Sequence, residues 1–127
     1  MTSEPFELLA DTVPASVARI RRFAADACRS SSPRVDPDTV ALLVSEVATN
    51  ALVHGEGRVR VRVRPTASGL RVEVHDGSHV LPSRRRATPM DEGGRGIALV
   101  EALSSGWGAE TTSDGKTVWF EVDAATA

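Results

Sequence analysis

The sequence predicts an α+β fold, a two-layer α/β sandwich in which a mainly antiparallel sheet is covered on one face by three helices. Two observations predict the sheet: valines alternate with arginines over residues 58–64, and a second alternating segment follows at 70–74. A third observation predicts the helices, because apolar residues recur at helical spacing within 17–27, 40–51 and 97–103. A chain of 127 residues has the length of one domain.

The other elements can be placed in chain order around these segments. Residues 6–10 are a short apolar segment and predict an edge strand, and Pro14 suits the first turn of the helix that follows it. Residues 107–111 and 116–122 predict a second hairpin, because the turn 113–115 between them reads Ser-Asp-Gly.

The composition excludes several classes of protein. The net charge is −2 with both signs spread along the chain, which argues against nucleic-acid binding driven by phosphate neutralisation. Cys28 is the one cysteine, so neither an internal disulfide nor a thiolate metal cluster is available. No apolar run approaches the roughly 20 residues of a membrane span, and a secretory signal is absent. We expect a cytoplasmic protein with no membrane or direct nucleic-acid partner, and flexible ends at residues 1–5 and 124–127.

Three polar side chains form one row on the helix predicted to end near residue 54. Glu46, Asn50 and His54 follow each other at intervals of four, so on a helix they lie one above another beside the apolar stripe. An ordinary solvated helix flank would explain this row. Asparagine is unfavourable inside a helix unless its amide has a partner, which favours a second interpretation. In this second interpretation, the Asn50 amide oxygen ligates a hard cation such as Mg²⁺, and Glu46 is the general base.

A long segment without helical or strand periodicity precedes the third helix. The strand before it ends in Asp76-Gly77-Ser78, and the helix after it opens with Gly93-Gly94-Arg95-Gly96. Backbone N–H groups at such a helix start can face an anion, typically a phosphate. The segment itself, 79–92, is long for a small domain, and segments of this kind are usually functional or disordered. We expect a basic lid over a polyphosphate, with these arginines in contact with phosphate or a partner: Arg84, Arg85 and Arg86.

Four motifs, in their order along the chain, resemble the ATP-binding domain shared by gyrase, histidine kinases, mismatch-repair ATPases and the heat-shock chaperone. The motifs are Glu46-x-x-x-Asn50, Asp76-Gly77, Gly94-x-Gly96 and Gly115-Lys116-Thr117. The chain size and the runs GRGIALVEAL and GKTVWFEV are similar to those of the stand-alone anti-sigma-factor serine kinases, above all the actinobacterial regulatory members. The resemblance covers Phe6 to Val122 and implies a histidine-kinase-like ATPase fold that binds ATP and Mg²⁺.

The resemblance also implies a role for each matching residue. Asn50 would ligate the magnesium that bridges the phosphates, and Glu46 would activate the attacking hydroxyl or water. Asp76 would accept the adenine amino group, and Thr117 would support Asp76 through a water or a direct bond. The other ATP-binding residues that it implies are His54, Gly77, Gly93, Gly94, Arg95 and Gly96.

Two functions are compatible with these residues. The first is a serine/threonine protein kinase that sequesters a sigma factor and phosphorylates an anti-sigma antagonist, and the presence of Glu46 favours it. The second is a nucleotide-gated protein-binding regulator without significant phosphoryl transfer. It stays open because Ser78 stands where the family usually has the glycine of Asp-x-Gly, which predicts a reshaped adenine pocket. The resemblance also implies a homodimer. A sensor histidine kinase is disfavoured, because that class needs a helical phosphoacceptor segment upstream and no histidine precedes Val40.

Overall fold

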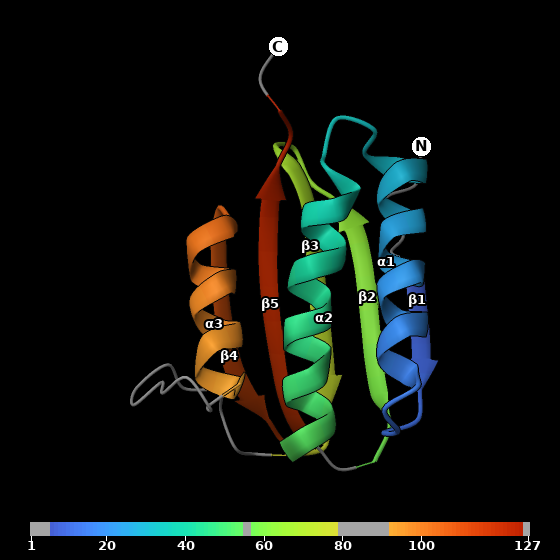
Figure 1. Ribbon diagram of the computed structural model, residues 1–127, viewed down its shortest axis with the longest axis vertical. Coiled ribbons are helices and arrows are strands. Elements are labelled where there is room, and N and C mark those ends of the chain that lie inside the picture. The colour runs from blue at the N-terminus through green and yellow to red at the C-terminus, as the bar shows by residue number, and fades with distance from the viewer. Residues whose placement is uncertain (1–5, 55–56, 79–91, 126–127) are drawn as a thin grey trace.

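The computed structural model describes residues 6–54, 57–78 and 92–125 (Figure 1). Five strands and three helices make up this part of the chain. In chain order they are β1 (Phe6–Ala10), α1 (Ser16–Ser31), α2 (Pro37–His54), β2 (Val59–Pro65), β3 (Gly69–Asp76), α3 (Glu92–Leu103), β4 (Gly106–Thr112) and β5 (Gly115–Asp123). The predicted α+β fold class is confirmed, and each predicted hairpin is present.

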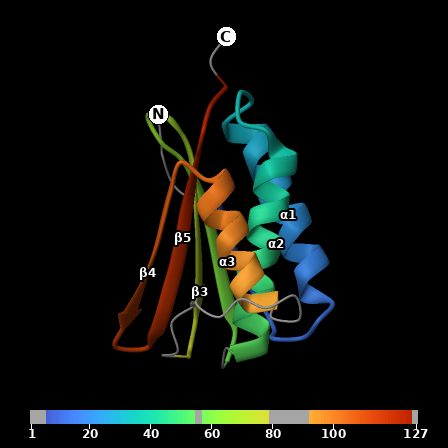
Figure 2. The same ribbon diagram turned by 60° about the vertical axis from the view of Figure 1, so that its left-hand side comes forward.

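The strands form one sheet with the order β1-β2-β3-β5-β4, and every neighbouring pair is antiparallel. All three helices lie on one face of this sheet, as the two views in Figures 1 and 2 show. The C-terminal strand β5 is inserted between β3 and β4. This insertion places the start of β5 beside the end of β3, because the two strands run in opposite directions.

Alternation along the strands separates a covered face from an open one. In β2 the valines at 59, 61 and 63 are completely buried under the helices, while the arginines between them are exposed. The same period continues in β3 and β5, where every second side chain is buried. Because side chains alternate across a strand, a residue's register alone decides which face it joins.

Helix α2 lies over the centre of the sheet and supplies the largest share of its apolar cover (Figure 1). Its start is capped by Asp36, whose carboxylate accepts the N–H of Asp38 at 3.0 Å and the hydroxyl of Thr39 at 3.0 Å. The predicted stripe is confirmed, since each of its members is at most 3% exposed: Val40, Leu43, Val44, Val47 and Ala51. The polar flank of α2 is therefore held in a defined orientation beside the core.

Backbone hydrogen bonds join the residues after β5 to two loops of the fold. The Ala124 N–H donates to the Ser68 carbonyl at 2.8 Å, and the Ala125 N–H donates to the Arg34 carbonyl at 2.9 Å. The Arg34 guanidinium also donates to the Ala125 carbonyl at 2.8 Å. The predicted flexibility of residues 124–127 stays a prediction. None of the helices in the described ranges combines the length and apolar character that a membrane span requires.

Cys28 is completely buried in α1, and its thiol donates to the Val35 carbonyl at 3.5 Å. Burial is the main cause that raises the pKa of this thiol, and the nearby Asp36 charge adds to it while Arg29 opposes it. We expect a thiol-specific alkylating reagent to leave Cys28 unmodified in the folded protein at neutral pH, and to modify it at the rate of unfolding in denaturant. Mass spectrometry of timed samples measures this rate. Fast modification of the native protein would contradict the burial.

Candidate functional site

The ends of four elements meet at one end of the molecule. Figures 1 and 2 show the C-terminal end of α2, the end of β3, the start of β5 and the start of α3 together at the lower end of the fold. Helix α2 packs against both α3 and β3 there. The tertiary structure therefore brings together predicted site residues that are widely separated in the sequence.

Asn50 lies in the C-terminal half of α2, one turn after Glu46. Its side chain is 8% exposed, and its amide forms no hydrogen bond with another of the described residues. The Glu46 side chain is half-buried on the same helix. An amide and a carboxylate therefore lie one helical turn apart on α2.

Asp76 is the last residue of β3 and points to the covered face of the sheet. Its carboxylate is 1% exposed, and its Oδ1 accepts the backbone N–H of Ser78 at 2.7 Å. In such a turn an Asp side chain accepts a hydrogen bond from the backbone N–H two residues further along the chain. This hydrogen bond fixes the Asp76 carboxylate at the end of the strand. Ser78 is itself buried, at 3% exposed. The residue that departs from the expected Asp-x-Gly pattern thus orients the carboxylate through its backbone.

Lys116 is a site residue whose role the sequence does not reveal. It stands opposite Asp76 in the register of β3 and β5, and its Nζ lies 2.9 Å from Asp76 Oδ2. Both side chains are only 1% exposed, so the ion pair is enclosed. One signal was available in the sequence: counting back by two from the apolar Phe120 and Val118 places Lys116 on the covered face of β5.

Among the described residues Thr117 makes no direct hydrogen bond to Asp76, and its predicted support of Asp76 through a water or a direct bond stays a prediction. Thr117 alternates with Lys116 and lies on the open face of the sheet, where its hydroxyl is 2.9 Å from Nδ1 of His75. Nε2 of His75 also lies 3.6 Å from Oδ1 of Asp114. Because a shift of one residue along a strand changes the face, Lys116 and not Thr117 contacts the Asp76 carboxylate.

Helix α3 begins at Glu92, so the predicted glycine motif forms its first turn. The first N–H groups of a helix have no partner within the helix, and this end of α3 is therefore a donor surface. The described part of the chain does not include residues 79–91, and hence none of the predicted lid arginines, Arg84, Arg85 and Arg86. The side chains of His54 and Arg95 are likewise outside the description. Their predicted roles, and those of Gly93, Gly94 and Gly96, stay predictions.

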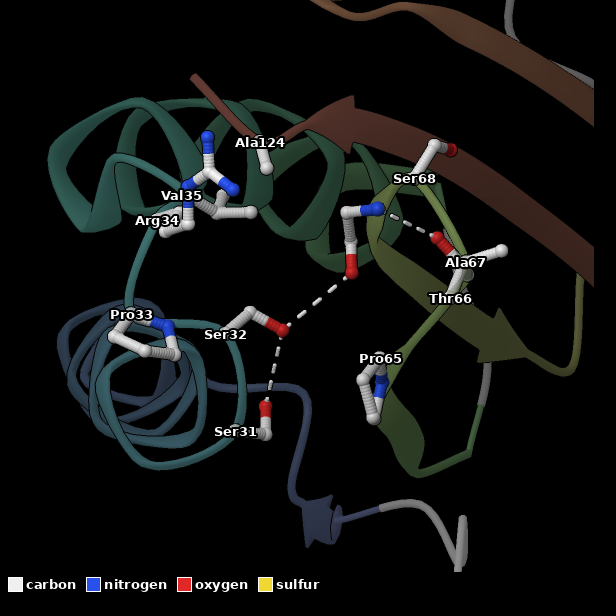
Figure 3. A pocket seen from close by; sticks show the side chains of 11 residues that line it. Ser31, Ser32, Pro33, Arg34, Val35, Pro65, Thr66, Ala67, Ser68 and Ala124 are labelled. Carbon is white, nitrogen blue, oxygen red and sulfur yellow. Dashed lines mark hydrogen bonds between the residues drawn. The ribbon is translucent and has the colours of Figure 1, made fainter. Parts of the chain in front are cut away.

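A separate cavity of about 270 Å³ opens at the opposite end of the sheet (Figure 3). The end of α1, the β2–β3 turn and the residue after β5 line it. Two hydroxyl groups of its wall hydrogen-bond to Gly69: Ser32 donates to the Gly69 carbonyl at 3.4 Å, and Thr66 accepts the Gly69 N–H at 3.0 Å. The cavity shares no residue with the predicted site.

Comparison with known proteins identifies related domains. A family model described as the histidine kinase-like ATPase domain matches residues 11–122. Among solved structures, the chain is similar to the crystal structure of the RsbU and RsbW domains of Rv1364c from Mycobacterium tuberculosis, with a TM-score of 0.60 and 20% sequence identity. That match covers 97% of this chain and 33% of the other, so this chain spans a third of the matched protein's length. No curated protein matches the sequence.

Proposed function

Because the chain belongs to the histidine kinase-like ATPase domain family, we propose that it binds ATP with magnesium at the end of the sheet where β3 ends and α3 begins. The observation that carries the proposal is the buried Asp76 carboxylate, which is held at the strand end by Ser78 and lies at the same end of the fold as Asn50. We further propose that the protein is an anti-sigma regulatory factor with serine/threonine kinase activity. The anti-sigma role and the kinase activity are proposed from the sequence motifs.

The described residues have the chemistry that Mg·ATP requires. Asn50 is a largely buried residue of α2, and amide oxygens are suitable ligands for Mg²⁺. The Asp76 carboxylate is acceptor-only when ionised, which suits the exocyclic amino group of adenine. The glycine turn of α3 directs N–H groups to the same end of the fold and suits phosphate oxygens.

Phosphoryl transfer then depends mainly on positioning and charge. Bound magnesium would neutralise part of the negative charge on the phosphate oxygens. In this proposal Asn50 holds the metal, and backbone N–H groups of Gly94 and Gly96 hold the phosphates. Glu46 accepts the proton of the attacking hydroxyl, which is a serine or threonine of an anti-sigma antagonist. Arginines of the lid, Arg84–Arg86, contact the phosphates or the partner protein.

The proposed partners follow from the same family of regulators. The protein would sequester a sigma factor and be switched by its phosphorylation of an anti-sigma antagonist, in the cytoplasm and as a homodimer. A second candidate function is a nucleotide-gated protein-binding regulator in which ATP orders the partner surface without significant transfer. The presence of Glu46 on the same helix as Asn50 favours the kinase.

Replacing Asn50 with alanine tests the nucleotide site. We expect millimolar Mg·ATP to raise the melting temperature of the wild type by several degrees, since a ligand at about 100 times its Kd adds about 2.7 kcal/mol. In Asn50→Ala the rise should disappear or require at least about tenfold more nucleotide, because the metal loses its protein ligand. Differential scanning fluorimetry with a titration of Mg·ATP measures both.

Thr49→Ala is the matched control, because it changes the neighbouring, half-buried position of α2. It should retain the full nucleotide effect. A wild type that shows no rise with Mg·ATP, while remaining folded, would refute the proposed function. An equal rise in wild type and Asn50→Ala would refute the metal-binding role of Asn50.

A further inference from the structure

Lys116 has unused hydrogen-bonding capacity in a buried place. Its ammonium is 1% exposed and lies 2.9 Å from Asp76 Oδ2, yet none of its N–H groups makes a hydrogen bond of acceptable geometry to a described residue. An ammonium has three donors and no acceptor. The ion pair therefore balances charge without satisfying the donors of Lys116.

Such an arrangement is costly for a purely structural pair. Taking an ammonium and a carboxylate out of water is unfavourable, and their attraction offsets the loss only when further hydrogen bonds satisfy the remaining donors and acceptors. The other residues of β5 that face the helices are apolar: Val118, Phe120 and Val122. A fourth apolar residue at 116 would continue that pattern. The energetics favour a partner for Lys116 that is not part of the described chain.

The position of the ion pair in the fold indicates the chemistry of a partner for Lys116. Lys116 is the second residue of β5 and Asp76 is the last residue of β3, and both are buried on the covered face of the sheet. The start of β5 and the end of β3 lie at the end of the fold where α2 ends and α3 begins (Figure 2). One oxygen of Asp76 already accepts the Ser78 N–H, and the other lies beside the Lys116 ammonium. The pair therefore presents an acceptor and a donor side by side at the proposed nucleotide site.

We propose that Lys116 completes the binding of the Watson–Crick edge of adenine, with Lys116 Nζ donating a hydrogen bond to ring N1 beside the 6-amino group that the family resemblance assigns to Asp76. Adenine carries this donor and this acceptor on adjacent atoms of one edge, complementary to the acceptor and donor of the pair. The inference rests on the proposed ATP binding and names Lys116 as a base-binding residue. It also assigns the recognition of adenine to residues of two strands, β3 and β5, rather than to one loop.

A cycle that combines a variant with a nucleotide analogue tests the proposal. Isothermal titration measures the Kd of ATP and of 1-deaza-ATP, which lacks the N1 acceptor, for wild type and Lys116→Met, each with Mg²⁺. We expect 1-deaza-ATP to bind the wild type roughly tenfold more weakly than ATP, as for the loss of a hydrogen bond to a charged donor. In Lys116→Met the two nucleotides should bind equally. 7-Deaza-ATP, which loses a ring nitrogen away from this edge, should bind the wild type like ATP.

The wild-type comparison stands even if Lys116→Met is too unstable to study, because removing one partner of a buried ion pair is strongly destabilising. Equal binding of ATP and 1-deaza-ATP by the wild type would overturn the role of Lys116 and leave the proposed function intact. Equal weakening by the 1-deaza and 7-deaza analogues would also overturn it. Absence of ATP binding by the wild type would instead refute the proposed function itself. These results are distinguishable in one set of titrations.

Discussion

Replacing Glu46 with alanine is expected to lower the rate of ATP turnover about 10²–10⁴-fold while the affinity for Mg·ATP stays unchanged. Glu46 lies one turn before Asn50 on α2 and is half-buried, so its replacement leaves the fully buried core residues in place. Loss of a general base removes stabilisation that exists only during transfer, which lowers the rate and spares binding. Release of labelled phosphate from ATP measures the rate without any knowledge of the protein acceptor.

Two further variants sharpen this test. Glu46→Gln keeps the shape and removes the basic carboxylate, so it should be as inactive as Glu46→Ala. Glu110→Ala removes an exposed carboxylate of β4 and should keep the wild-type rate. If Glu46→Ala turned over ATP at the wild-type rate, the assignment of Glu46 as the base would be wrong. A folded wild type that bound Mg·ATP with no turnover, even in the presence of an acceptor, would favour the nucleotide-gated regulator.

Replacing Gly115 with alanine is expected to lower the free energy of unfolding by about 3–5 kcal/mol. Gly115 begins β5 with φ of +149°, a conformation that side chains rarely adopt. A Cβ at this position would overlap the backbone oxygen of Asp76 and lie 2.9 Å from the Cα of Gly77. Neither neighbour is a flexible side chain, so the strand end itself must shift. Urea unfolding followed by circular dichroism measures the loss.

Gly57→Ala provides the matched control. Gly57 also has a positive φ, of +74°, but a Cβ there would meet no atom within 4 Å. Its replacement should cost only about 1 kcal/mol, for the backbone conformation alone. Similar losses in the two variants would show that the close approach of β5 to Asp76 contributes nothing. Because Gly115 touches the Asp76 backbone, its alanine variant should also bind Mg·ATP more weakly than Gly57→Ala does.

Local periodicity was sufficient to predict most of the elements. The stripe of α2 and the Val-Arg alternation of β2 are short-range patterns, and each depends only on which residues of one segment share a face. The cap of α2 is equally short-range, because Asp36 accepts hydrogen bonds from residues two and three positions on. Asn50 and Glu46 could be nominated for the same reason, since their relation is a single helical turn.

The sequence by itself therefore determined the fold class, the helical flank with Glu46 and Asn50, and the carboxylate at the end of β3. Only the tertiary structure decided which residue meets that carboxylate. The insertion of β5 between β3 and β4 is a pairing across a long separation in the chain, and no local pattern encodes its register. That register places Lys116 beside Asp76 and turns Thr117 to the open face, because neighbouring side chains of a strand point to opposite sides of the sheet.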